Sequence, residues 1–127
     1  MRADAVARAQ GIPPKFLENL LSDLRRARLV ASQRGTDGGY RLARPAASIS
    51  LADVIRAVDG PLAGVRDQAP EDLDYAGSAA SLRDVWIALR ASMRGVLEGT
   101  TLAHVATGRL PASVRRLLRD PDAWTRR

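Results

Sequence analysis

The sequence predicts a mainly α-helical fold that contains one small β-hairpin and ends in a long amphipathic helix. Three observations predict it. Apolar residues recur at helical spacing over residues 15–28, 51–59 and 81–98. A glycine-rich turn at residues 35–39 separates two short strand-like runs. The length of 127 residues suits one domain with an added dimerisation element.

The first two predicted helices are joined by a tight turn. Residues 3–10 are alanine-rich and should form a short helix that Gly11 ends, because glycine adopts the left-handed conformation of a helix cap. Pro13 and Pro14 follow, and proline is tolerated in the first turn of a new helix. The second helix is expected over residues 15–28. This order is that of a helix-turn-helix, although helical hairpins of other kinds are also common.

The next segment predicts a β-hairpin with a glycine-rich tip. Residues 29–34 and 40–43 should form its two strands, with the turn at residues 35–39 between them. Arg34, Arg41 and Arg44 would lie on or near this hairpin. A helix-turn-helix followed by a basic hairpin is the order of elements in a winged helix, which we expect over residues 1–60.

The second half of the chain predicts an acidic loop and a long helix. Ser50 should cap a helix over residues 51–59. Residues 61–80 carry four acidic side chains and little apolar content, which predicts a flexible loop. Residues 81–127 should contain the long helix, short helices over residues 101–107 and 110–119, and a frayed tail from Trp124.

The long helix carries an apolar stripe that either packs on its own domain or pairs with a second copy of the chain. A small winged helix has little core to offer, so we favour a dimerisation helix. The stripe consists of Leu82, Val85, Trp86, Leu89, Met93, Val96 and Leu97.

Composition limits the partners and cofactors. The net charge of +6 is divided between two basic lobes, residues 1–60 and 81–127, on either side of the acidic loop. Such a surface favours nucleic acid or an anionic membrane, although arginine-rich coding bias would give a similar composition. There is no cysteine and only one histidine, His104, so no cofactor or metal is expected. No apolar run or leader-like segment is visible, which predicts a cytoplasmic protein that does not enter a membrane.

Several short motifs resemble the Rrf2 family of bacterial transcription regulators, in order and at the right spacing. They cover roughly residues 3–107, and residues 11–60 are the most specific part. The motifs are Gly11-Ile12-Pro13-Pro14-Lys15-Phe16-Leu17-Glu18, Leu24-Arg25-Arg26-Ala27, Gly38-Gly39-Tyr40-Arg41-Leu42-Ala43-Arg44-Pro45 and Ile49-Ser50-Leu51-Ala52-Asp53-Val54-Ile55-Arg56-Ala57-Val58-Asp59-Gly60.

The resemblance implies a homodimer that recognises a partly palindromic operator in double-stranded DNA. The start of the second helix would enter the major groove, and the wing would enter the minor groove. The residues that this places against DNA are Pro13, Lys15, Phe16 and Glu18 on the helix, and Arg34, Gly35, Thr36 and Arg41 on the wing.

The chemistry of these side chains fits those places, but each has a simpler alternative. Glu18 can accept from cytosine N4, Phe16 can contact a thymine methyl group, and Lys15 can bind guanine or phosphate. Arg34 suits the negative potential of a narrow minor groove. The alternatives are a core position for Phe16, a solvated surface position for Lys15 or Arg34, and a favourable charge at the helix N-terminus for Glu18.

The chain departs from the family pattern in three respects. Cluster-binding members carry three cysteines in the loop that corresponds to residues 61–80, and this chain has none there. Family members usually begin with a further helix before the segment that matches residues 2–4. Arg28 stands where the family usually has glycine, and Asp37 interrupts the glycine run of the wing, where its charge would weaken phosphate contacts.

The sequence therefore predicts a non-enzymatic, DNA-binding transcription regulator, of repressor type, that acts as a homodimer without an iron–sulfur cluster. Its effector, if one exists, cannot be identified from the residues. The alternative is a protein-interaction module of the same fold that dimerises but no longer binds DNA.

Overall fold

The structure, a computed structural model, describes residues 1–35, 38–64 and 67–127. Thr36 and Asp37, which were named above as wing residues, lie outside the described residues. The helices are α1 (Ala3–Gln10), α2 (Pro14–Arg26), α3 (Leu51–Asp59), α4 (Leu82–Leu97), α5 (Leu102–Thr107) and α6 (Ala112–Leu118), and the strands are β1 (Val30–Gln33) and β2 (Gly39–Leu42). Short 3-10 turns cover Ala46–Ser48, Pro70–Asp72, Gly77–Ala79 and Pro121–Trp124.

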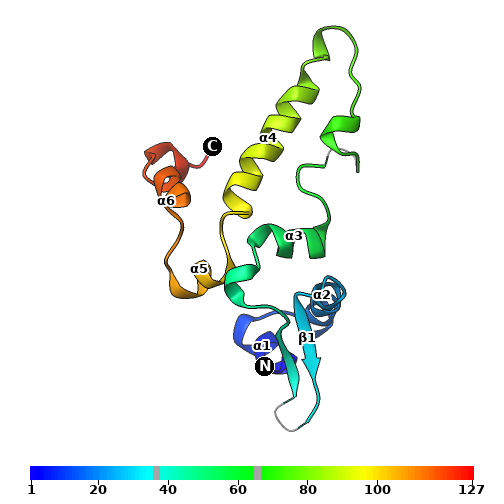
Figure 1. Ribbon diagram of the computed structural model, residues 1–127, viewed down its shortest axis with the longest axis vertical. Helices are drawn as coiled ribbons and strands as arrows, with labels where there is room; N and C mark the ends of the chain where they lie inside the picture. Colours follow the sequence, from blue (N-terminus) through cyan, green and yellow to red (C-terminus); the bar gives the residue numbers. More distant parts are fainter. Residues whose placement is uncertain (36–37, 65–66) are drawn as a thin grey trace.

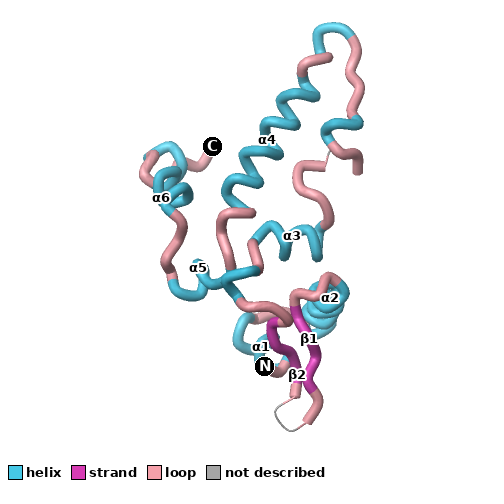
Figure 2. The backbone as a smooth tube through the Cα atoms, viewed as in Figure 1, coloured by secondary structure: helices cyan, strands magenta, loops and turns pink. Residues whose placement is uncertain are grey.

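The elements divide into a head and an arm (Figure 1). The head consists of α1, α2, the hairpin and α3, and the hairpin points away from the rest of the molecule (Figure 2). The arm consists of α4 and the part of the segment 61–80 that the structure describes. Helices α5 and α6 lie on the other side of α4.

The pair α1–α2 forms the small core of the head. Gly11 ends α1 in the left-handed conformation, with φ of 63°, as the sequence predicts. The next residue, Ile12, donates its N–H to the carbonyl of Ala7 at 2.9 Å. Ala7 is buried together with Leu17 and Leu21 of α2. Burial of this cluster removes one face of each helix from water and so fixes α2 on α1.

The end of α2 differs from the sequence prediction. The helix stops at Arg26, and Arg28 adopts a left-handed conformation with φ of 61°. The N–H of Leu29 donates to the carbonyl of Leu24, and the N–H of Arg28 donates to that of Arg25, both at 2.9 Å. These two bonds make a Schellman motif, in which glycine is the usual left-handed residue. The prediction of a helix to residue 28 was wrong. The left-handed residue that ends this helix is an arginine and not the usual glycine, so the sequence carries no sign of the helix end.

The hairpin is confirmed with nearly the expected strand limits. Strands β1 and β2 pair antiparallel, with Ser32 opposite Tyr40. Tyr40 also donates its N–H to the carbonyl of Met1 at 2.6 Å, so the first residue covers the outer edge of β2. Gly39 is required at this contact, because an added Cβ would lie 2.0 Å from the carbonyl oxygen of Met1.

Helix α3 begins as the sequence predicts. Ser50 and Asp53 form a capping box, in which each side chain accepts the other residue's backbone N–H at 3.0 Å. The residue before the cap, Ile49, is completely buried. An isolated bridge joins Ser50 to Thr101, so the start of α3 is attached to the start of α5.

The acidic segment has more to bury than the sequence suggests. Leu62, Pro70 and Leu73 are buried. The turn Pro70–Asp72 packs against α4, and Glu71 of this turn forms an ion pair with Arg90. The expectation that the segment has little to bury was wrong: three of its apolar residues are buried, and the turn that begins with Pro70 meets a long helix far along the chain.

The C-terminal part contains the expected short helices. Thr101 caps α5, and the Nδ1 atom of His104 accepts the N–H of Thr101 at 3.0 Å, so this half-buried histidine completes the cap and is not a freely exposed side chain. Trp124, the first residue of the expected frayed tail, ends the turn Pro121–Trp124, and its indole donates to the carbonyl of Leu118 at 2.8 Å. The residues after it are exposed and belong to no helix or strand. Among the described residues, no helix is long and apolar enough to cross a membrane.

Candidate nucleic-acid interface

The start of α2 presents an exposed face with the residue types that the sequence analysis assigned to the major groove. Pro13 is the residue before the first helical turn, and Lys15, Phe16 and Glu18 are all exposed. Phe16 is 57% exposed, whereas its neighbour Leu17 is buried. The alternative of a core position for Phe16 is therefore wrong. An aromatic side chain left in water at a helix start is available for contact with a partner.

Lys15 and Glu18 form a weak ion pair on this face. The Nζ atom of Lys15 lies 3.8 Å from Oε2 of Glu18, and both side chains are mostly exposed. Exposed pairs of this kind contribute little to stability, typically less than about 1 kcal/mol. Lys15 can therefore exchange this contact for a phosphate or a guanine, and Glu18 can exchange it for a base edge, each at a small cost in free energy.

The wing presents a second set of exposed polar groups. Arg34 directly follows β1 and is exposed, as is Arg41 on β2, whose Nη1 donates to the carbonyl of Leu42 at 3.3 Å. Gly35 has φ of 113°, a conformation that side-chain-bearing residues rarely adopt. Thr36, the remaining wing residue of the sequence prediction, lies outside the described residues.

The structure places the helix and the wing in one packed unit, because α2 packs against β1. Basic side chains continue around this unit at the end of α2. Arg25 and Arg26 are exposed, and only Arg26 has an acidic partner among the described residues, Asp23 at 3.4 Å. Exposed cationic groups can thus contact a polyanion at three places: Lys15 at the start of α2, Arg25 and Arg26 at its end, and Arg34 and Arg41 on the wing.

The apolar stripe of α4 is divided between two faces. One side is half-buried, and there the indole N–H of Trp86 donates to the hydroxyl of Tyr75, in the segment that precedes α4, at 3.2 Å. The other side includes Val85 and Leu89, which remain 55% and 45% exposed. The half-buried residues of the stripe are Leu82, Trp86, Met93, Val96 and Leu97.

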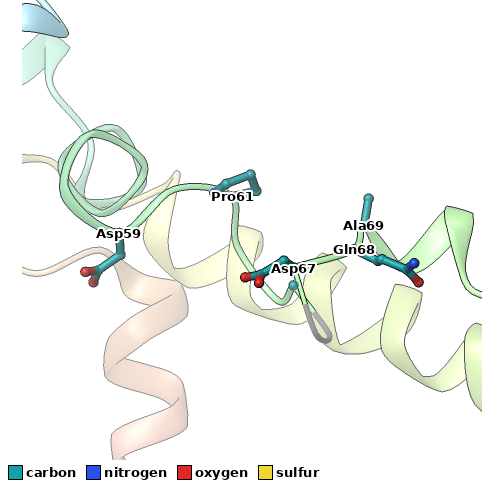
Figure 3. A pocket seen from close by; sticks show the side chains of 6 residues that line it. Asp59, Pro61, Asp67, Gln68 and Ala69 are labelled. Carbon is teal, nitrogen blue, oxygen red and sulfur yellow. The ribbon is translucent and has the colours of Figure 1, made fainter.

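Two cavities lie where the arm meets α3. The first, of about 400 Å³, has Asp59 at the end of α3 and Asp67 in the loop among its lining residues (Figure 3). The second, beside it, is lined by Arg56, Arg90 and Arg94 together with apolar residues. The sequence analysis did not single out these arginines. The available signal was the four-residue spacing of Arg90 and Arg94, which places both on one face of α4.

The comparison with protein families identifies one family. Residues 1–108 match the model of the family Rrf2, described as "Iron-dependent Transcriptional regulator".

The residues of this chain do not fit the iron that this description mentions. The sequence contains no cysteine, so no thiolate can bind a cluster. Within residues 1–35, 38–64 and 67–127, no three histidine or acidic side chains come together as a set of metal ligands. Asp59 and Asp67 in Figure 3 are only two carboxylates.

Individual relatives agree with the family match. The chain is 58% identical over 120 residues to a Mycobacterium tuberculosis protein named as an HTH-type transcriptional regulator, Rv1287, covering 94% of this chain and 74% of the relative. It is 34% identical over 103 residues to the HTH-type transcriptional regulator CymR of Bacillus subtilis, and the match covers 81% of this chain and 70% of the relative.

Solved structures share the fold. The structure of CymR, the global cysteine regulator of B. subtilis, matches with a TM-score of 0.69 and 32% identity over 84% of this chain and 78% of that chain. IscR of T. potens matches with a TM-score of 0.63 and 29% identity, and the match covers 100% of this chain and 75% of that chain. The head is therefore a winged helix, and the chain belongs to the Rrf2 family of transcriptional regulators.

Proposed function

We propose that this transcriptional regulator binds double-stranded DNA as a homodimer at a partly palindromic operator and represses transcription by occupying it. The observation that carries the proposal is the exposed start of α2. Phe16 lies in water between Lys15 and Glu18, while the opposite face of the helix is buried in the head. Nothing in the packing of the head requires an aromatic residue at this exposed position.

The proposed contacts follow from groove chemistry. The start of α2 would enter the major groove, with Phe16 against a thymine methyl group and Glu18 accepting from cytosine N4. The wing would place Arg34 in the minor groove, where A·T-rich narrowing deepens the negative potential. Phosphates would supply most of the affinity, and the base contacts would set register and specificity.

The homodimer would form through the uncovered side of α4. Val85 and Leu89 lie four residues apart, so they share one face of the helix and expose it to water. A second copy is the partner that completes a partly palindromic site, because a two-fold protein reads two half-sites. The regulator would act in the bacterial cytoplasm, where the chromosome lies.

The decisive experiment compares two arginines. Arg34→Ala should weaken binding to the gene's own upstream region by roughly 1–3 kcal/mol, the usual size of a lost specific contact. Arg126→Ala removes an equal charge from the exposed tail and should change the affinity little. Fluorescence anisotropy at constant salt measures both, because nonspecific affinity changes steeply with salt. If both variants lose the same small amount of DNA affinity, the specific contact of Arg34 is refuted and a protein-interaction module is favoured.

A further inference from the structure

Among the residues that the structure describes, the cavity between α3 and α4 is lined by cationic and apolar side chains. It has a volume of about 360 Å³, at the lower end of the range of small-molecule sites. The polar side chains in the described part of this lining are guanidinium groups. The lining residues are Arg56, Pro61, Leu62, Ala69, Pro70, Arg90 and Arg94.

The three arginines come from two elements and meet at this cavity. Arg90 and Arg94 lie on successive turns of α4, and Arg56 lies on α3. Arg56 forms an ion pair with Oε1 of Glu98, and Nε of Arg94 lies 3.9 Å from the same oxygen. Arg90, whose side chain is only 16% exposed, is paired with Glu71.

The carboxylates do not balance this charge inside the cavity. Glu71 and Glu98 contact the arginines but are not among the lining residues, and two carboxylates face three guanidinium groups. The backbone N–H of Glu71, and then the hydrogen bond from Arg90, hold the pKa of this carboxyl below its ordinary value, so it stays ionised. Among the described side chains that contact the three arginines, guanidinium groups outnumber carboxylates by one, and Asp59 and Asp67 line the adjoining cavity rather than this one.

From this lining we propose that the cavity binds a small organic anion, one whose carboxylate or phosphate group is held by Arg56 and Arg94 and whose carbon body rests on Pro61, Leu62 and Pro70. Each guanidinium offers five donors in a planar fork, so Arg56 and Arg94 have N–H groups to offer an anion beyond those that contact Glu98. Leu62 and Pro70 are buried, and they provide the apolar surface that a purely inorganic anion would not need.

The position of this site makes the anion an effector of DNA binding, a role that rests on the proposed function. The pair Arg56–Glu98 joins the head to the end of α4. An anion that draws Arg56 and Arg94 toward the cavity competes with Glu98 for them. It would therefore favour one orientation of the head on the arm, and a ligand changes such an equilibrium by its difference in affinity for the two orientations.

The first test measures binding without DNA, so it does not depend on the proposed function. Phenyl phosphate and citrate are titrated into the purified protein at constant ionic strength, with benzyl alcohol as a neutral control, by ligand-observed NMR and thermal unfolding. At least one anion should bind with one-to-one stoichiometry and a Kd of roughly 1 mM or tighter. Benzyl alcohol should not bind. Absence of binding by both anions would overturn the proposal.

Variants on one helix separate a site from general charge attraction. Arg94→Gln should weaken anion binding by about tenfold or more, the typical loss for a charge-assisted contact. Arg83→Gln, an exposed position on the same helix outside the cavity, should bind as the unchanged protein does. Arg56→Gln provides a second lining variant from α3, and unfolding curves check that each variant is folded. Equal weakening by Arg83→Gln would overturn the site.

The second test asks whether the anion changes operator affinity. The anion that binds should shift the operator Kd severalfold in the unchanged protein and not in Arg94→Gln. If the anion binds without DNA but no DNA binding is found at all, the proposed function fails and the site stands. If the protein binds DNA and the anion does not change the operator Kd, the effector role is overturned.

Discussion

Arg28 is one of the described side-chain-bearing residues in the left-handed conformation, together with Ala63 and Asp67. Its φ of 61° lies in the left-handed region, where a side-chain-bearing residue costs about 1–2 kcal/mol. The Schellman bonds of Arg28 and Leu29 hold it there. Replacement by glycine removes this cost but adds about 0.4–1 kcal/mol of conformational entropy to the unfolded chain. The net difference should therefore favour glycine over alanine at this position by about 0.5–1 kcal/mol.

The comparison is made between Arg28→Gly and Arg28→Ala, since both remove the same charge from the end of α2. Urea unfolding should show the glycine variant to be the more stable, with a thermal midpoint roughly 2–4 °C higher. Ala27→Gly is the matched control. Residue 27 has φ of −81°, so glycine there should lower stability by about 0.5–1 kcal/mol. The reasoning is refuted if glycine is no better than alanine at position 28.

Three further outcomes are expected. Leu89→Asp should give a folded monomer, because this side chain is exposed in one copy and would be buried between two; a dimer of this variant in sedimentation would place the interface elsewhere. The purified protein should contain no stoichiometric iron by elemental analysis, because the sequence offers no thiolate ligand, and one iron or more per chain would contradict this. Ser50→Ala should lower the unfolding free energy by about 1 kcal/mol through loss of the α3 cap, whereas an unchanged urea midpoint would show that the cap contributes nothing.

The elements with local signals could be predicted from the sequence. Helix α3 starts and ends where Ser50 and Gly60 indicate, and Gly11 ends α1 in the expected conformation. The hairpin follows from its glycine-rich turn. In each case a cap or a turn residue fixes the boundary within a few positions of itself, so distant parts of the chain are not needed.

The features that depend on distant contacts could not be predicted. Pro70 and Leu73 look like isolated apolar residues in an acidic segment, yet both are buried, and the turn that begins with Pro70 packs on α4. The stripe of α4 predicts an apolar face but not that Trp86 donates to Tyr75 of the preceding segment while Leu89 stays exposed. The cavity arginines require the approach of α3 to α4, which no local pattern encodes. The proposed DNA contacts of Phe16 and Arg34 came from the family resemblance, and the exposure of both side chains is the part that the structure adds.

Helix α3 connects the proposed DNA-contacting unit to the rest of the chain at both of its ends. Its first residues are bound to the start of α5, where Leu51 donates to the carbonyl of Thr100 and Leu102 donates to that of Ile49, each at 2.9 Å. Its last turn is joined to α4 by the ion pair of Arg56 with Glu98. Because α2 packs on α3, a dimer formed through α4 would fix the separation of its two α2 helices by way of α3. The half-site spacing that the regulator accepts should therefore depend on the α3–α4 contact, and this contact is where the proposed anion binds.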